Sequence, residues 1–193
     1  MITHIHGKLI EKTPTHCVLE TNGLGYFIHI SLNTYTELSD DKSVMLYTHF
    51  YVREDTQALY GFSTKKEREV FRQLISVSGI GVSTAMVMLS SMTPDEIQRA
   101  IASANVALIK KIKGIGAKTA QRVIVDLQDK ILKTVDVDAI SPDLDNSIRE
   151  ESLSALDVLG FSRKQTERVI DNILKEQPDL DVERLIKQAL KRL

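Results

Sequence analysis

The sequence is poor in cysteine and has no apolar stretch long enough to cross a membrane. Its 193 residues include one cysteine, Cys17, and no tryptophan. One cysteine excludes an internal disulfide framework, and its place in the alternating stretch HCVLE is typical of a small core residue. No run approaches the roughly 20 apolar residues of a membrane span, and MITHIHGKLI lacks the basic and apolar segments of a signal peptide. We therefore expect a cytoplasmic protein that does not bind membranes.

The small net charge of −1 conceals a strong asymmetry along the chain. Residues 1–60 carry a net charge of −3, residues 61–133 carry +6, and residues 134–193 carry −4. Attraction to phosphate depends on the local field rather than on the total charge. The middle third is therefore where we expect a nucleic-acid partner to bind.

The period of the sequence changes from that of strands to that of helices near residue 63. Five short alternating stretches, separated by turn signals such as Asn22-Gly23, lie at 6–12, 16–22, 26–32, 43–52 and 56–62. Five strands in about sixty residues favour an OB-type β-barrel over residues 1–63. From Lys65 onward the period is helical, and Thr93-Pro94-Asp95-Glu96 is typical of a helix start with a capping box.

Two further segments follow this basic helical domain, which we assign to residues 64–133. Residues 134–147 contain four Asp and no clear helical or strand period, and we expect a flexible acidic linker there. Residues 148–193 show three helical segments, broken near Gly160 and near Pro178. A module of this size is marginal alone, which favours a role in docking.

Two glycine pairs of the same design interrupt the helical region. Gly79-Ile80-Gly81 and Gly114-Ile115-Gly116 are 35 residues apart, and each falls between two expected helices. Glycine accepts positive φ and allows another backbone to approach closely, and backbone N–H groups at a helix start suit an anion such as phosphate. Isoleucine would fill the core beneath each turn. Cations surround the second pair: Lys110, Lys111, Lys113, Lys118 and Arg122. Backbone contacts carry no base code, so this pattern predicts binding by shape rather than by sequence.

Other interpretations of these motifs remain open at this point. A single Gly-x-Gly can be a plain helix-to-helix turn, although two copies in a basic segment favour a shared function. GIGAKT is not a nucleotide-binding P-loop, because Ala117 precedes Lys118 and Lys111 stands where the loop needs glycine. His4 and His6 alternate on one strand, but no third residue has the spacing of a metal ligand. We expect no bound metal and no cofactor.

The chain strongly resembles the RuvA family. The resemblance rests on the two glycine turns, the expected barrel before them, the stretch VREDTQALYGF at residues 52–62 and the terminal module. The family binds Holliday junctions for branch migration in recombination and DNA repair. The resemblance covers essentially the whole chain and implies two helix-hairpin-helix motifs. It implies tetramers, sometimes paired as octamers, that hold a four-way junction open and planar. It further implies a RuvB-type hexameric ATPase and a RuvC-type resolvase as partners, and a place in the SOS response to DNA damage.

The resemblance also assigns roles to particular residues. The first hairpin would contact DNA through Gly79, Ile80, Gly81, Ser83 and Thr84, and the second through Lys113, Gly114, Ile115, Gly116, Lys118, Thr119 and Arg122. Where the family usually has a basic residue and a proline in the first hairpin, this chain has Ser83 and Val82, so the first hairpin lacks a side-chain cation.

Glu54-Asp55 matches the acidic pin of the family, with Arg53 beside it at the junction centre. Charge patterning alone would place such a pair at a solvated turn. Four pairs meeting at a four-fold centre would repel phosphates and exclude continuous duplex.

Four apolar residues of the terminal module are candidates for the surface that binds the motor: Leu156, Leu159, Phe161 and Leu190. Each of them could instead belong to the core of the module. Because the module has few interior positions, we expect some of the four to be exposed.

On these grounds we expect a non-catalytic DNA-architectural subunit, and two alternative functions remain open. A helix-hairpin-helix repair enzyme would need a catalytic carboxylate, for which Asp126 offers a position without an evident partner. A general single-strand binder would use the barrel, which by sequence is acidic and is expected to lack a basic groove with stacking aromatics.

Overall fold

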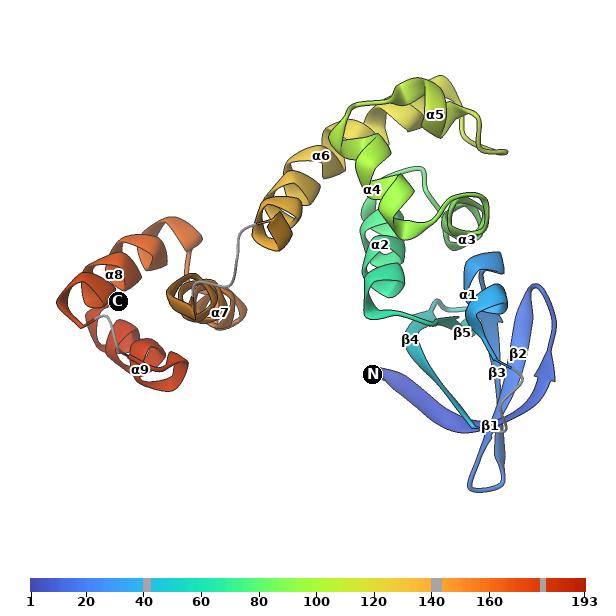
Figure 1. Ribbon diagram of the computed structural model, residues 1–193, viewed down its shortest axis with the longest axis horizontal. Coiled ribbons are helices and arrows are strands. Elements are labelled where there is room, and N and C mark those ends of the chain that lie inside the picture. Colours follow the sequence, from blue (N-terminus) through green and yellow to red (C-terminus); the bar gives the residue numbers. More distant parts are fainter. Residues whose placement is uncertain (40–42, 140–143, 178–179) are drawn as a thin grey trace. The chain divides into compact units, whose positions relative to one another are not determined.

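The computed structural model describes residues 1–39, 43–139, 144–177 and 180–193 (Figure 1). The chain forms two compact units, Met1–Val135 and Asp136–Leu193. The first holds the barrel and the central helices, and the second holds the terminal helices. In the described part, no helix combines the length and the apolar character that a membrane span needs.

Five strands form the closed barrel of the first unit. They are β1 (His4–Lys12), β2 (His16–Thr21), β3 (Leu24–Ile30), β4 (Val44–Val52) and β5 (Gln57–Phe62). Their order around the barrel is β1-β2-β3-β5-β4; the β3–β5 pairing is parallel and the other pairings are antiparallel. Alternate residues point inward, and Cys17 and Leu19 are fully buried. Burial raises the pKa of the Cys17 thiol to about 11. The prediction of a five-stranded barrel is thus confirmed.

A short helix, α1 (Leu32–Glu37), follows β3 and was missed by the sequence patterns. The expected third strand ran to residue 32, whereas β3 ends at Ile30. Ser31 caps the helix, since its hydroxyl accepts a hydrogen bond from the Thr34 N–H at 3.0 Å. A helix of six residues is too short to show a helical period in the sequence, so the patterns did not reveal it.

The barrel is followed by α2 (Lys65–Ser76), α3 (Val82–Ser91), α4 (Pro94–Ala102), α5 (Val106–Lys110) and α6 (Ala117–Ala139), which continues into the second unit. The capping box expected at the start of α4 is present, with Thr93 and Glu96 bonded reciprocally. The apolar faces of these helices enclose one core that includes Phe71, Leu74 and Met88, and Phe62 of β5 joins it. The barrel and the helices are therefore joined by shared apolar packing.

Glu67 of α2 adds a buried polar link between the helices and the barrel side. Its side chain is 2% exposed. One carboxylate oxygen accepts a hydrogen bond from the Thr34 hydroxyl at 2.6 Å, and the other accepts one from Ser31. Burial raises the pKa of Glu67, and the hydroxyl donors offset part of that effect. By sequence Glu67 looks like an ordinary charged residue in a first helical turn, so its burial could not be predicted from pattern.

The raised pKa of Glu67 implies that the stability of the fold depends on pH. A carboxyl group whose pKa is higher in the folded state favours folding at low pH, and this contribution is lost as the pH rises through the folded-state pKa. The free energy of unfolding of the parent, relative to Glu67→Gln, should therefore fall as the pH rises from about 4 toward neutrality. Denaturant titrations at several pH values measure this, with the exposed Glu69→Gln as control. Parallel pH profiles for the parent and Glu67→Gln would contradict the assignment.

The expectation of a linker without regular structure at 134–147 is wrong at both ends. Helix α6 continues to Ala139, and α7 (Leu144–Val158) begins before residue 147. Residues 140–143 lie outside the described residues, and the predicted division into four domains stays a prediction.

The second unit is a bundle of α7, α8 (Arg163–Glu176) and α9 (Val182–Arg192). Its core includes Leu153, Leu156, Ile170, Ile173 and Leu185. The break expected near Gly160 is present, since Gly160 has a φ of +93° and α8 begins at Arg163. The break expected near Pro178 falls on residues 178–179, which lie outside the described part.

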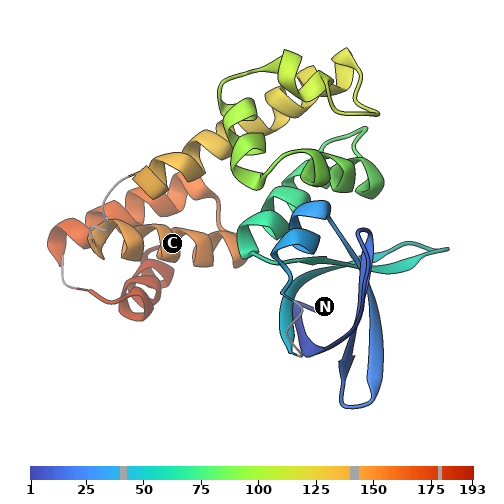
Figure 2. The same cartoon turned by 45° about the vertical axis from the view of Figure 1, so that its right-hand side comes forward.

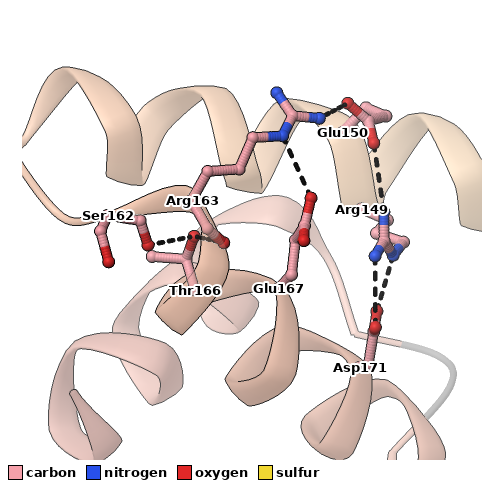
Figure 3. Close-up of polar contacts among 7 residues, drawn as sticks. All are labelled: Arg149, Glu150, Ser162, Arg163, Thr166, Glu167 and Asp171. Atoms are coloured by element: carbon pink, nitrogen blue, oxygen red, sulfur yellow. Dashed lines mark hydrogen bonds and ion pairs between the residues drawn. The ribbon is translucent and has the colours of Figure 1, made fainter.

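Charged side chains tie α7 to α8 (Figure 3). Arg149 of α7 forms a two-pronged ion pair with Asp171, with nitrogen–oxygen distances of 2.7 and 3.2 Å. Arg163 of α8 contacts Glu150 at 2.9 Å and Glu167 at 3.2 Å. Two-pronged pairs fix orientation more strictly than single contacts do, so this network aligns the two helices.

Candidate nucleic-acid interface

The two glycine turns have the same backbone hydrogen-bonding pattern. In the first, between α2 and α3, the Ile80 N–H donates to the Val77 carbonyl at 3.0 Å, and the Gly81 carbonyl accepts from Ala85 at 3.0 Å. In the second, between α5 and α6, the Ile115 N–H donates to Ile112 at 3.1 Å, and Gly116 accepts from Ala120 at 2.9 Å. Each of these residues stands 35 positions from its counterpart. The repeat seen in the sequence is therefore a structural repeat.

Within each pair, the two glycines meet different requirements. Gly79 and Gly114 have φ values of +95° and +90°, a region that residues with side chains rarely adopt. Gly81 and Gly116 lie outside that region, and a Cβ added to either would meet no atom within 4 Å. Of the two properties that the sequence suggested for glycine here, positive φ is thus found only at the first glycine of each pair. Nothing in the described chain requires glycine at the second position, where a missing side chain leaves room for a ligand.

The isoleucine of each turn is buried, as expected for a residue that fixes the turn to the core. Ile80 and Ile115 are each 5% exposed and belong to the central core cluster. The glycines that flank each isoleucine are exposed. The first N–H groups of α3 and α6 have no partner within their helices, so each turn presents donors of the kind that bind phosphate.

Basic residues adjoin the second turn in the sequence, whereas residues 77–91, around the first turn, include no Lys or Arg. Five basic side chains near the second turn are exposed: Lys110, Lys111, Lys113, Lys118 and Arg122. Ser83, the counterpart of Lys118, is exposed in the first turn of α3, while Thr84 and Thr119 are half-buried. The Arg122 Nε lies 3.8 Å from Asp126, a long contact between two exposed groups that costs little to break.

The pair Glu54-Asp55 forms the tip of the β4–β5 hairpin. The Arg53 N–H donates to the Thr56 carbonyl at 2.8 Å, which closes a tight turn around the two carboxylates. All four residues are exposed, and Figure 2 shows this hairpin reaching beyond the body of the barrel. The Arg53 guanidinium lies 5.2 Å from the centre of the Tyr51 ring, a contact that holds the cation beside the tip.

The four apolar candidates of the terminal module divide into core and surface. Leu156 is fully buried and belongs to the core, so the expectation that it contacts a partner is corrected. Phe161 is half-buried against the same core. Leu159 and Leu190 are 58% and 42% exposed, and Val158, which the sequence patterns did not single out, is 88% exposed. Val158 is the last residue of α7, and its apolar side chain gives no sign in the sequence that it is exposed.

No catalytic constellation forms around Asp126. Among the described residues its exposed carboxylate pairs with Arg122, one turn earlier on the same helix, at 3.8 Å, which is an ordinary surface contact. In the same part no group of three potential metal ligands comes together, and His4 and His6 stay a pair.

Comparison with known proteins gives the same three-part layout. Residues 1–61 match the model of the RuvA N-terminal domain, residues 71–129 the SAM-like helix-hairpin-helix tandem, and residues 147–193 the RuvA C-terminal domain. A protein of Christiangramia forsetii is 55% identical over the full length of both chains, and one of Flavobacterium psychrophilum is 52% identical over the full length. A protein of Bacteroides fragilis is 46% identical, again with both chains fully covered. Each of these relatives is named Holliday junction branch migration complex subunit RuvA.

Proposed function

The chain belongs to the RuvA family, and from this premise we propose that it is the DNA-binding subunit of a Holliday junction branch migration complex. It binds four-way junctions by their structure, in recombination and DNA repair. It carries no catalytic residue of its own and uses no cofactor, because the motor activity of such a complex resides in an ATPase partner. Since it acts on chromosomal DNA, it works in the cytoplasm and in the response to DNA damage.

One observation carries this proposal. Two turns with the same backbone hydrogen-bonding pattern each place a glycine before a helix, at positions 81 and 116, where a Cβ would meet no atom within 4 Å. Two cradles of this kind in one unit can hold the backbones of two strands, or two points of one duplex arm. The first hairpin contributes Gly79, Ile80, Gly81, Ser83 and Thr84, and the second Lys113, Gly114, Ile115, Gly116, Lys118, Thr119 and Arg122. Because the donors are backbone groups, the grip is independent of base sequence.

The salt dependence of binding tests this interface. Removal of one cation that contacts phosphate should weaken binding to junctions of any sequence alike and reduce the slope of log K against log salt by about one per bound subunit. Lys118→Ala is expected to behave in this way. Ser83→Ala, at the matching position of the first hairpin, is the control and should leave the slope unchanged. A slope for Lys118→Ala equal to that of the parent would remove Lys118 from the interface.

Glu54 and Asp55 exclude duplex DNA from the centre of the complex. Their charges are exposed at a turn, where they serve no fold-stabilising contact with a cation in the described chain. Several such tips meeting in one assembly would repel phosphates and keep strands apart. Arg53 lies between the tip and the barrel, where it can hold the backbone of a separated strand.

Neutralising this pin should change specificity more than affinity. The double variant Glu54→Gln/Asp55→Asn is expected to raise affinity for linear duplex by roughly five-fold, about 1 kcal/mol for two exposed charges, and affinity for the junction by less. Glu20→Gln, which removes an exposed charge from β2, controls for total charge. The measurement is competition between the two DNAs; an unchanged junction-to-duplex preference would mean that the pin is only a solvated turn.

The assembly has further members. We propose a homotetramer, which two copies can join as an octamer, because a four-way junction presents four equivalent arms. The terminal module binds a RuvB-type hexameric ATPase through apolar side chains, for which the candidates are Leu159 and Leu190, both exposed, and Phe161, which is half-buried. A RuvC-type resolvase is the partner that acts on the same junction.

A further inference from the structure

Aromatic side chains form a row across the outer face of the barrel. In register, His16 of β2 pairs with His29 of β3, His29 with Tyr60 of β5, and Tyr60 with His49 of β4. Phe27, on the same face of β3, has its ring centre 4.5 Å from that of His16 and 5.1 Å from that of His29. The rings of His29 and Tyr60 are 5.3 Å apart. These five residues, the aromatic row, correct the expectation that the barrel lacks stacking aromatics.

One end of the aromatic row is covered and the other is open. Phe71 of α2 packs against Tyr60 at 5.3 Å and against His49 at 5.4 Å, which closes the end next to the helices. At the other end Phe27 is 51% exposed. Burial lowers the pKa of His29, with a smaller contribution from the nearby His16. The His29 ring is therefore neutral at neutral pH, so it presents an aromatic face rather than a charge.

The aromatic row is continuous with both parts of the proposed DNA interface. Toward the pin, Tyr51 lies 6.3 Å from Tyr60, and its ring carries the Arg53 guanidinium. Toward the first hairpin, a cleft of about 400 Å³ separates the row from α3. Its walls are His29 and Tyr60 on the barrel side and Ser83, Met86 and Val87 on the helix side, with hydroxyls of Thr15 and Ser90. Ser83 thus belongs both to the first hairpin and to the cleft.

We propose that this cleft and the open end of the aromatic row bind unpaired DNA bases beside the first hairpin. The inference rests on the proposed function, because the hairpin and Arg53 supply the contacts to the DNA backbone. In OB-type barrels strands 2 and 3 form the face that binds oligonucleotides, and here β2 and β3 carry His16, Phe27 and His29. Aromatic rings on such a face stack with bases of any sequence.

The charge distribution supports bases rather than phosphates as the occupants. The described residues that line the cleft include no Lys, Arg, Asp or Glu. At the far end Glu11 pairs with His16 at 3.2 Å and would repel a phosphate. The first hairpin has Ser83 where the second has Lys118. Stacking beside the first hairpin would therefore add a contact to unpaired bases, which a cation at position 83 would not provide.

Binding of the full chain to three DNAs tests the inference: a fully paired four-way junction, the same junction with two unpaired thymines per strand at the crossover, and single-stranded oligothymidylate. Phe27→Leu keeps an apolar side chain but removes the ring. It should weaken binding to the two DNAs with unpaired bases by about five-fold or more, the loss of one stacked base, and leave the paired junction unaffected. Phe27→Tyr should restore parental affinity, and Leu24→Ala, exposed on the same strand, should change nothing.

Equal affinities of the parent and Phe27→Leu for all three DNAs would overturn the inference. A lower assembled mass of Phe27→Leu in light scattering would also overturn it, since the face would then be a contact between copies of the chain. Failure of this inference can be distinguished from failure of the proposed function. If the proposed function were wrong, the parent would bind the paired junction no better than it binds linear duplex. Binding of oligothymidylate that depends on Phe27 would support the inference even in that case.

Discussion

Gly116→Ser should weaken binding to four-way junctions by about ten-fold or more, which is about 1.4 kcal/mol, with little change in the stability of the fold. A Cβ at position 116 meets no atom within 4 Å, and its φ lies outside the left-handed region. Serine is a favoured residue before a helix start, so α6 should form as before. The added side chain would nonetheless occupy the space that the DNA backbone needs. Gly81→Ser is the matched change in the first hairpin.

Gly114→Val separates the two roles of glycine in the turn. Gly114 has a φ of +90°, and a β-branched residue resists that conformation. This variant should lose stability as well as DNA binding, because the turn itself is strained. Thermal unfolding followed by circular dichroism, together with junction binding, measures both effects. Should Gly116→Ser fold and assemble normally and bind junctions as tightly as the parent, the turns would be plain helix connectors.

Removal of the terminal unit should abolish stimulation of the motor and leave junction binding in place. The chain is best ended at Ala139, because α6 continues to that residue. The first unit has its own core and both hairpins, so it should assemble and bind junctions. Branch migration by the ATPase partner, measured on a labelled junction, should fall to the level seen without the chain.

A point variant in the full-length chain tests whether the loss of stimulation comes from the surface of the terminal unit rather than from shortening the chain. Leu159→Asp places a charge at a side chain that is 58% exposed, outside the core of the terminal unit. It should fold, bind junctions and stimulate the motor less than the parent does. Leu156→Asp would instead unfold the unit, since Leu156 is fully buried. Full stimulation by the truncated chain would exclude the docking role.

Features set by local sequence could be predicted, and those set by distant contacts could not. The 35-residue repeat of the glycine turns, the Asn22-Gly23 turn and the cap at Thr93 depend on a few adjacent residues, and the structure has all three. The open space at Gly81 and Gly116, by contrast, depends on what surrounds the turn. Sequence could show that glycine is present but not which glycine serves the backbone and which leaves room.

The buried Glu67 and the aromatic row show the same limit. Glu67 lies in a first helical turn, where carboxylates are common. Its burial depends on hydroxyl donors that include Ser31 and Thr34, more than 30 positions earlier in the chain. The rings of the aromatic row come from four strands and align only through the barrel register. Leu156 and Leu159 differ by three positions, yet one is core and the other surface, because helix α7 ends between them.

The central claim is that the chain recognises the shape of a four-way junction. The measurement that tests it most directly is equilibrium competition between a four-way junction and linear duplex of the same sequence and length, at physiological salt, with the mass of the complex determined in parallel. We expect a preference for the junction of at least about 100-fold, about 2.7 kcal/mol, in a complex with four copies of the chain or a multiple of four. Equal affinity for the two DNAs would contradict the account.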